Sequence, residues 1–303
     1  MNRIFQKYNL WPKLAMGVTT AAIVLIASEA GAYYEDLKEG DTGPHSTFHY
    51  EMTRTLARAA GFSKTDAEMI AVAAEATDRM LYTGTLPGSP TIQLAGTERM
   101  DSSKGPYFHW PRRGVYNATN QYEQPGARNT CLYFTRTDKC INAKPEINAI
   151  ENWAVFNVGA PAVGTPSASV NGGASTPVQG SSSIALGIYL HALADTYTHD
   201  PCMKKLQVRS HMSRTSLTIE CSVVRWHQDQ EFGPEATNLG TSYTKEGGLA
   251  VWKALLFFRQ SNSLPTAALW NETQAVRFIK TYSEMENEID RSNYATSTYT
   301  SLN

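Results

Sequence analysis

One segment combines an almost wholly apolar helical pattern with ionisable side chains. Within ALGIYLHALADTYTH, which ends at residue 199, ionisable groups recur at every fourth position: His191, Asp195 and His199. On a helix this spacing places the three in one row, and Ile184 and Ile188 continue the row upstream. The row therefore faces the protein interior, where an unpaired carboxylate is strongly destabilising. A divalent metal ion removes that penalty because it supplies the opposite charge.

A second row occurs in VVRWHQDQEF, where His227 and Glu231 are again four residues apart and Val223 lies one turn earlier. A histidine and a carboxylate one turn apart can form half of a zinc site. Taken alone, either row is more simply explained by a core histidine bonded to its neighbours or by a surface ion pair. Two such rows in a chain with seven histidines favour a metal site.

Four further candidates lie upstream. His49 falls on the apolar face of the helix expected over 47–60, and His45 lies one turn earlier. Asp78 ends the run AVAAEATD, whose small apolar residues favour an inward carboxylate. His109 lies in PYFHWPR, where packing among the aromatic rings is its alternative role. A metal site therefore requires the fold to bring distant parts of the chain together.

The clear periodic patterns are helical, over residues 47–60, 64–82, 183–199, 221–232, 246–260 and 272–291. No convincing set of alternating strands accompanies them, so the sequence predicts an all-α fold: a compact multi-helix single domain with long irregular loops. Irregular structure is expected for 83–106, 111–148 and 158–182, and a frayed tail after Arg291. No Asp, Glu, Lys or Arg occurs from 152 to 194. This fits either a flexible loop before a buried helix or an uncharged lip beside a substrate cleft.

The first 32 residues carry the pattern of a secretory signal peptide. Three basic residues precede an apolar run over 14–27, and an Ala-Gly-Ala cleavage site precedes Tyr33. The run is shorter than the roughly 20 residues needed to cross a bilayer, and an uncleaved N-terminal anchor is the alternative. We therefore expect 1–32 to be a signal peptide, 33–303 to be the mature domain, and the protein to be secreted or periplasmic.

Four cysteines remain in the mature domain: Cys131, Cys140, Cys202 and Cys221. An even number in an exported chain favours two disulfides, and we expect local pairs, 131 with 140 and 202 with 221. Free thiols in a reducing compartment are one alternative. A structural zinc is another, although no pair has C-x-x-C spacing.

The charge balance excludes some classes of function. The formal net charge is −1, and loss of residues 1–32, with three basic residues and Glu29, makes the chain slightly more acidic. Such a chain has no basic field to hold duplex DNA by counterion release, so no duplex binding is expected. The sequence also lacks a dinucleotide-binding fingerprint and a phosphate-binding loop, which argues against Rossmann and P-loop enzymes.

The order of these motifs from His49 to Glu231 resembles the zinc-dependent phospholipase C superfamily, which includes the single-strand-specific nucleases of fungi and plants. HALAD and HQDQE are the specific parts. Members are mostly helical enzymes with three zinc ions. The resemblance implies that Asp195 bridges two of these ions. One of the pair would be completed by three side chains: His191, Asp78 and His109. The other would be bound by His49 and by the mature N-terminal residue, Tyr33.

The third zinc ion would be held by His199, His227 and Glu231. Asp195 and His199 are four residues apart, whereas the family usually spaces them by six. Tyr33 replaces the family's usual Trp and lies far from His49, so His45 is an alternative ligand. Glu231 matches the phospholipases, whereas the nucleases typically have Asp at that position, and this favours a lipid substrate.

The resemblance therefore implies hydrolysis of a phosphodiester, in which zinc ions activate water and neutralise charge on the phosphoryl oxygens. Asp78 would orient the water or act as a base. The expected substrate is a phospholipid at a membrane surface. A single-stranded nucleic acid is the alternative within the superfamily, and a non-catalytic exported metal-binding protein is the alternative outside it.

Overall fold

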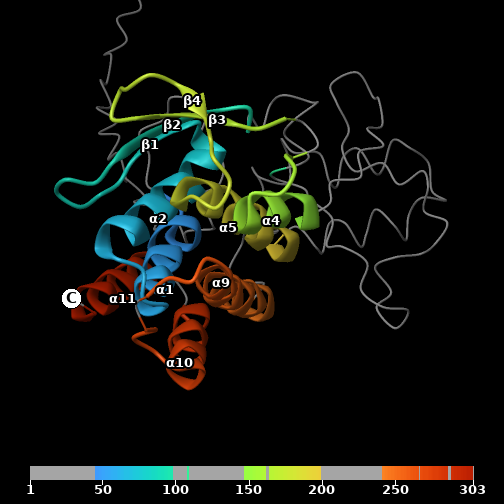
Figure 1. Ribbon diagram of the computed structural model, residues 1–303. Helices are drawn as coiled ribbons and strands as arrows, with labels where there is room; N and C mark the ends of the chain where they lie inside the picture. The colour runs from blue at the N-terminus through green and yellow to red at the C-terminus, as the bar shows by residue number, and fades with distance from the viewer. Residues whose placement is uncertain are drawn as a thin grey trace, which may run out of the picture.

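A computed structural model describes residues 45–97, 108, 147–161, 164–198, 241–265, 267–285 and 288–302. Helices predominate in this part of the chain, and a small antiparallel sheet accompanies them (Figure 1). In chain order the elements are the π-helix η1 (Thr47–Met52), α1 (Thr53–Ala59), α2 (Lys64–Arg79), β1 (Leu81–Thr83), β2 (Thr91–Ala95), α4 (Ile147–Phe156), β3 (Ser167–Val170), β4 (Thr176–Pro177), α5 (Ser183–Thr198), α9 (Thr241–Ser261), α10 (Glu272–Ser283) and α11 (Glu288–Ser301). The fold is therefore mostly helical rather than all-α.

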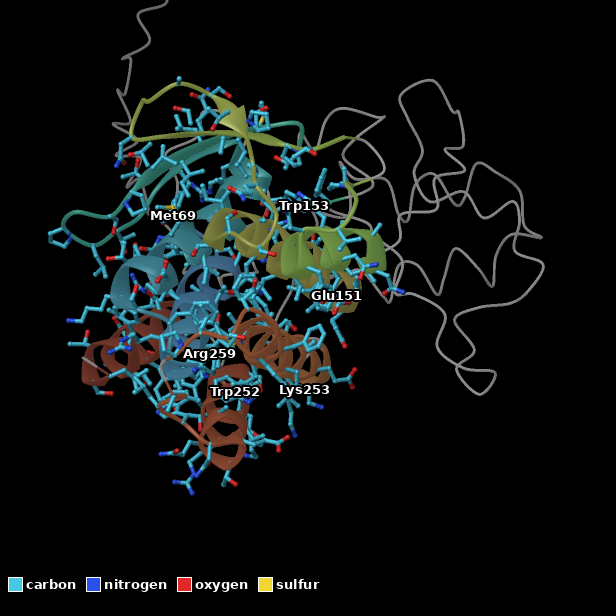
Figure 2. All side chains as sticks on the ribbon, in the orientation of Figure 1. Met69, Glu151, Trp153, Trp252, Lys253 and Arg259 are labelled. Atoms are coloured by element: carbon cyan, nitrogen blue, oxygen red, sulfur yellow. The ribbon has the colours of Figure 1, made fainter. Side chains whose placement is uncertain are left out.

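Helix α5 packs against α2, α4, α9 and η1, and its most extensive contact is with α2. A Cβ atom added at Gly187 would lie 2.3 Å from the backbone oxygen of Ile70 and 2.7 Å from Cβ of Ala73. Only glycine permits this approach of α5 to the backbone of α2. His191 follows Gly187 by one turn, so this contact helps to set the position of that imidazole. Trp153 of α4 and Trp252 of α9, labelled in Figure 2, belong to the same hydrophobic core.

The first two elements follow each other without a break, as the helix expected over 47–60 requires, but the stretch opens as a π-helix. Every residue of η1 is buried. Ser46 caps it, because its Oγ accepts a hydrogen bond from the backbone N–H of His49 at 3.0 Å. Such wide helical turns often occur at functional sites. The buried and capped turn holds the His49 backbone in one place.

The four strands form an antiparallel sheet in the order β1-β2-β3-β4, next to α2 (Figure 1). Ile92 of β2 pairs with Tyr82 on one side and with Val170 on the other. Ile92 and Leu94 are buried, and the intervening side chain is exposed. This alternation lasts only five residues, and β3 and β4 consist of small residues, half of them Ser or Thr. The segments expected to be irregular therefore contain a sheet that their composition conceals.

The helices expected over 64–82, 183–199 and 246–260 are confirmed as α2, α5 and α9, with shifted ends. The single helix expected over 272–291 is wrong, since α10 ends at Ser283 and α11 begins at Glu288. The frayed tail is also wrong: α11 continues to Ser301 and buries Arg291, Ala295 and Tyr299, which share one helical face. Helix α4 was not anticipated. The helix expected over 221–232 lies outside the described residues.

Across the described ranges, no helix combines the length and the apolar character needed to cross a bilayer.

Candidate metal centre

Two imidazoles and one carboxylate meet in the interior of the helical layer: His49 from η1, and His191 and Asp195 from α5. One potential ligand atom from each lies within 4.8 Å of the other two. Their side chains are essentially inaccessible to solvent, with at most 1% exposed. Among the described residues this is the one group that could hold a metal ion. The inward orientation expected from the spacing in HALAD is thus what α5 adopts.

The two oxygens of Asp195 face different histidines. Oδ1 lies 3.3 Å from Nε2 of His49, and Oδ2 lies 3.2 Å from Nε2 of His191. Charge-assisted N–H···O bonds are shorter, about 2.7–2.9 Å. Two ligand atoms each about 2.0–2.2 Å from one tetrahedral zinc ion would be about 3.3–3.5 Å apart. The spacing of these donors therefore fits a shared metal ion better than direct ion pairs.

A second carboxylate approaches from α2. Oδ1 of Asp78 lies 3.5 Å from Nε2 of His191, and the Asp78 side chain is 5% exposed. Nε2 of His191 thus faces one carboxylate oxygen from each of two helices. The rings of His49 and His191 lie close, with centroids 4.2 Å apart. Two buried carboxylates and two imidazoles make a donor set of the kind that zinc accepts.

The same charges act on the protonation of His191. Burial lowers the pKa of its imidazole, the carboxylates of Asp195 and Asp78 raise it, and the net effect is a pKa above the usual value for histidine. In the metal-free protein a proton on His191 therefore partly replaces the cation that the carboxylates favour. Proton and metal ion compete for the same imidazole.

His45, the alternative ligand, lies outside this group. Its Nε2 is 2.8 Å from Oε1 of Glu51, and its ring meets the edge of Tyr50. Oε1 of Glu51 also accepts a hydrogen bond from Ser292 of α11 at 2.7 Å. Within the described residues, His45 therefore contributes to a contact between the start of η1 and the C-terminal helix.

Glu75 was missed by the sequence analysis, although it lies three residues before Asp78 in the run AVAAEATD. It is 1% exposed, and its Oε1 accepts from the backbone N–H of Ser46 at 3.0 Å and from Nε of Arg79 at 2.7 Å. Burial raises the pKa of Glu75, and the Arg79 guanidinium and the Ser46 N–H oppose that rise. Two acidic residues at i and i+3 within the otherwise uncharged run AVAAEATD were the available signal.

Other predicted residues lie outside the described part of the chain, and their roles stay predictions. They are the ligands Tyr33, His109, His199, His227 and Glu231, and the cysteines Cys131, Cys140, Cys202 and Cys221. The same holds for the signal peptide expected at 1–32.

Comparison with known proteins gives one match. A family of unknown function (DUF6765) matches residues 45–124, less than a third of the chain. The matched segment contains His45, His49, Asp78 and His109 and ends before α5. No curated protein and no solved structure matches. The chain thus shares with that family the segment that supplies one histidine of the buried centre and the neighbouring carboxylate.

Proposed function

We propose that this protein is a zinc-dependent hydrolase of phosphodiester bonds, and specifically an exported phospholipase C. The observation that carries the proposal is the position of Asp195 between His49 and His191, with one carboxylate oxygen toward each. One oxygen toward each imidazole is compatible with a carboxylate that would bridge two metal ions, as the resemblance implies. The resemblance of the HALAD and HQDQE motifs to the phospholipase C and nuclease superfamily supplies the reaction type.

In this proposal each described side chain has a defined task. Asp195 holds the two halves of the centre at a fixed spacing, and His49 and His191 bind as neutral imidazoles on either side. Asp78 lies beside His191, where it completes that half of the centre or orients the attacking water. Zinc supplies Lewis acidity, which activates water near neutral pH and offsets charge on the phosphoryl oxygens. The chain carries a slight net negative charge and so has no net basic field for a polyanion. A lipid substrate does not depend on such a field.

The proposal extends beyond the described residues to the predicted ligands. His109 would join the half of the centre that contains His191, and Tyr33, as the mature N-terminal residue, would join His49. His199, His227 and Glu231 would hold a third zinc ion. The glutamate in the last motif favours a phospholipid over a single-stranded nucleic acid.

The test is to measure zinc per chain in the purified protein and its activity on phosphatidylcholine vesicles and on single-stranded DNA. His191→Ala should weaken zinc binding by more than about 100-fold, because loss of a ligand exceeds the about 10–100-fold effect of an outer-sphere change. His45→Ala is the matched control and should keep zinc, because His45 pairs with Glu51 outside the centre.

Each outcome separates the alternatives. Cleavage of DNA alone would replace the phospholipase with a nuclease of the same superfamily. One tightly bound metal ion without hydrolysis of either substrate would identify a non-catalytic metal-binding protein. A wild-type protein that binds no divalent metal would refute the proposed centre itself.

A further inference from the structure

Helix α2 presents two acidic residues to the neighbourhood of the buried centre. Asp78 reaches His191 directly. Glu75, almost one turn earlier, is 1% exposed but lies outside the group of potential ligands. Its carboxylate contacts Ser46 and Arg79. One helix thus contacts both imidazole-bearing elements, α5 through Asp78 and η1 through Glu75.

Two hydrogen bonds of ordinary length connect Glu75 to the backbone of His49 through Ser46. Oε1 of Glu75 accepts from the backbone N–H of Ser46 at 3.0 Å. Oγ of Ser46 in turn accepts from the backbone N–H of His49 at 3.0 Å. The Ser46 carbonyl accepts from the N–H of Tyr50 at 3.1 Å. Ser46 is therefore fixed from α2 on one side and holds the first turn of η1 on the other.

The charge of Glu75 is balanced locally. Arg79 lies one turn further along α2, and its Nε is 2.7 Å from Oε1 of Glu75. A buried carboxylate with a guanidinium partner is tolerated, but an apolar residue of similar size would often be at least as stabilising. A structural ion pair alone does not account for the bond to the Ser46 backbone, which only a side-chain acceptor at this position can make.

We infer that Glu75 is a positioning residue for the metal centre: by holding Ser46 it fixes the start of η1 and thereby the location of the His49 imidazole. This rests on the proposed metal-binding function. Outer-sphere groups that orient a ligand commonly affect metal affinity by about 10–100-fold. The hydrogen bond, rather than the negative charge, is the feature that matters, since the acceptor oxygen is what contacts Ser46.

The experiment compares Glu75→Ala with Glu75→Gln in the full chain. Zinc affinity is measured by competition with a chromophoric chelator, and amide hydrogen exchange at 46–50 is measured in the metal-free protein. Glu75→Ala should weaken zinc binding by about 10–100-fold and speed exchange at the His49 amide. Glu75→Gln should retain zinc affinity within about threefold, because the amide oxygen still accepts from Ser46. Asp66→Ala removes another acidic side chain of α2, one that contacts Ser63 and Ser183 rather than η1, and should leave zinc affinity nearly unchanged.

A second pair of variants tests the same bond from the other end. Ser46→Pro and Ser46→Ala both remove the hydroxyl. Only proline also removes the backbone N–H that donates a hydrogen bond to Glu75. The φ angle of Ser46 is −64°, which proline adopts. Ser46→Pro should therefore bind zinc at least about tenfold more weakly than Ser46→Ala.

Three results would overturn the inference. They are unchanged zinc affinity in folded Glu75→Ala, equal losses in Glu75→Ala and Asp66→Ala, and a loss in Glu75→Gln as large as in Glu75→Ala. If wild-type protein binds no zinc, the proposed function fails. The hydrogen-exchange comparison then still decides whether Glu75 fixes the start of η1.

Discussion

Replacing Gly187 by alanine tests whether the close approach of α5 to α2 builds the centre. The new Cβ would lie 2.3 Å from the Ile70 oxygen, 2.7 Å from Cβ of Ala73 and 3.0 Å from the Ala74 nitrogen. Carbon atoms prefer separations of about 3.5–4.0 Å, so the helices must part by about 1 Å. Because two of the three neighbours are backbone atoms, no side-chain rotation relieves the contact.

The expected loss follows from two opposing contributions. Overpacking destabilises a core by about 1–3 kcal/mol, and the backbone contacts place this site at the upper end. Alanine gains about 1 kcal/mol over glycine within a helix. We therefore expect Gly187→Ala to lower the free energy of unfolding by about 2 kcal/mol, which is about 4–8 °C in melting temperature for a domain of this size. Parting the helices also draws Asp78 away from His191, so zinc affinity should fall by at least about tenfold.

The assays are thermal unfolding with a chelator present and zinc titration of the folded variant. Gly247→Ala in α9 is the matched control, since its Cβ would meet Cζ of Phe48 at 3.3 Å, the far end of a side chain. That variant should be neutral or slightly stabilised. A Gly187→Ala protein as stable as wild type would refute the packing argument. A destabilised variant with unchanged zinc affinity would break the link between this contact and the centre.

Three further predictions concern charges. Arg54→Ala should lower the free energy of unfolding by about 3–5 kcal/mol, because it leaves buried Glu68, 3.5 Å away, without its guanidinium partner. Both variants are measured by urea titration. As the comparison, Lys280→Ala breaks an exposed ion pair and should change the free energy of unfolding by less than about 1 kcal/mol. Burial raises the pKa of Glu151 on α4 (Figure 2), so ionisation of this side chain disfavours the folded state as pH rises through that pKa. Glu151→Gln should therefore be more stable than wild type at pH 7, with an advantage that disappears below the normal glutamate pKa; an advantage constant with pH would contradict this. Removal of zinc by a chelator should lower the melting temperature more at pH 8 than at pH 6, as calorimetry would measure, and a reversed order would count against the centre.

The sequence predicts the parts of this structure that depend on local periodicity. The first and last residues of HALAD are expected on one buried helical face because spacing by four fixes direction on a helix, and α5 bears this out for His191 and Asp195. The sheet could not be predicted, since its strands are two to five residues long and are held by pairing partners up to about 80 positions apart along the chain. Helix α11 was missed because serine and threonine mask a buried face of Arg291, Ala295 and Tyr299.

The meeting of His49 with α5 lies beyond local patterns as well. Each imidazole could be assigned to a buried face, but their distance depends on how closely two helices pack and on where η1 begins. Gly187 sets how closely α5 packs against α2. Ser46, held by Glu75, sets where η1 begins. A glycine within an apolar helix and a glutamate within an alanine-rich one are weak signals taken singly. They acquire meaning only once α2 is known to face both η1 and α5.

The charge balance explains why zinc removal should depend on pH. Asp78 and Asp195 bring two negative charges into a nearly inaccessible space. In the metal-free protein a proton on His191 offsets one of them, and its raised pKa means that this stabilisation is complete below the normal histidine pKa and is lost as pH rises through the folded-state value. A divalent cation offsets both charges and does not titrate in this way. The bound and metal-free proteins therefore differ most in stability at alkaline pH, where the proton can no longer act as the substitute.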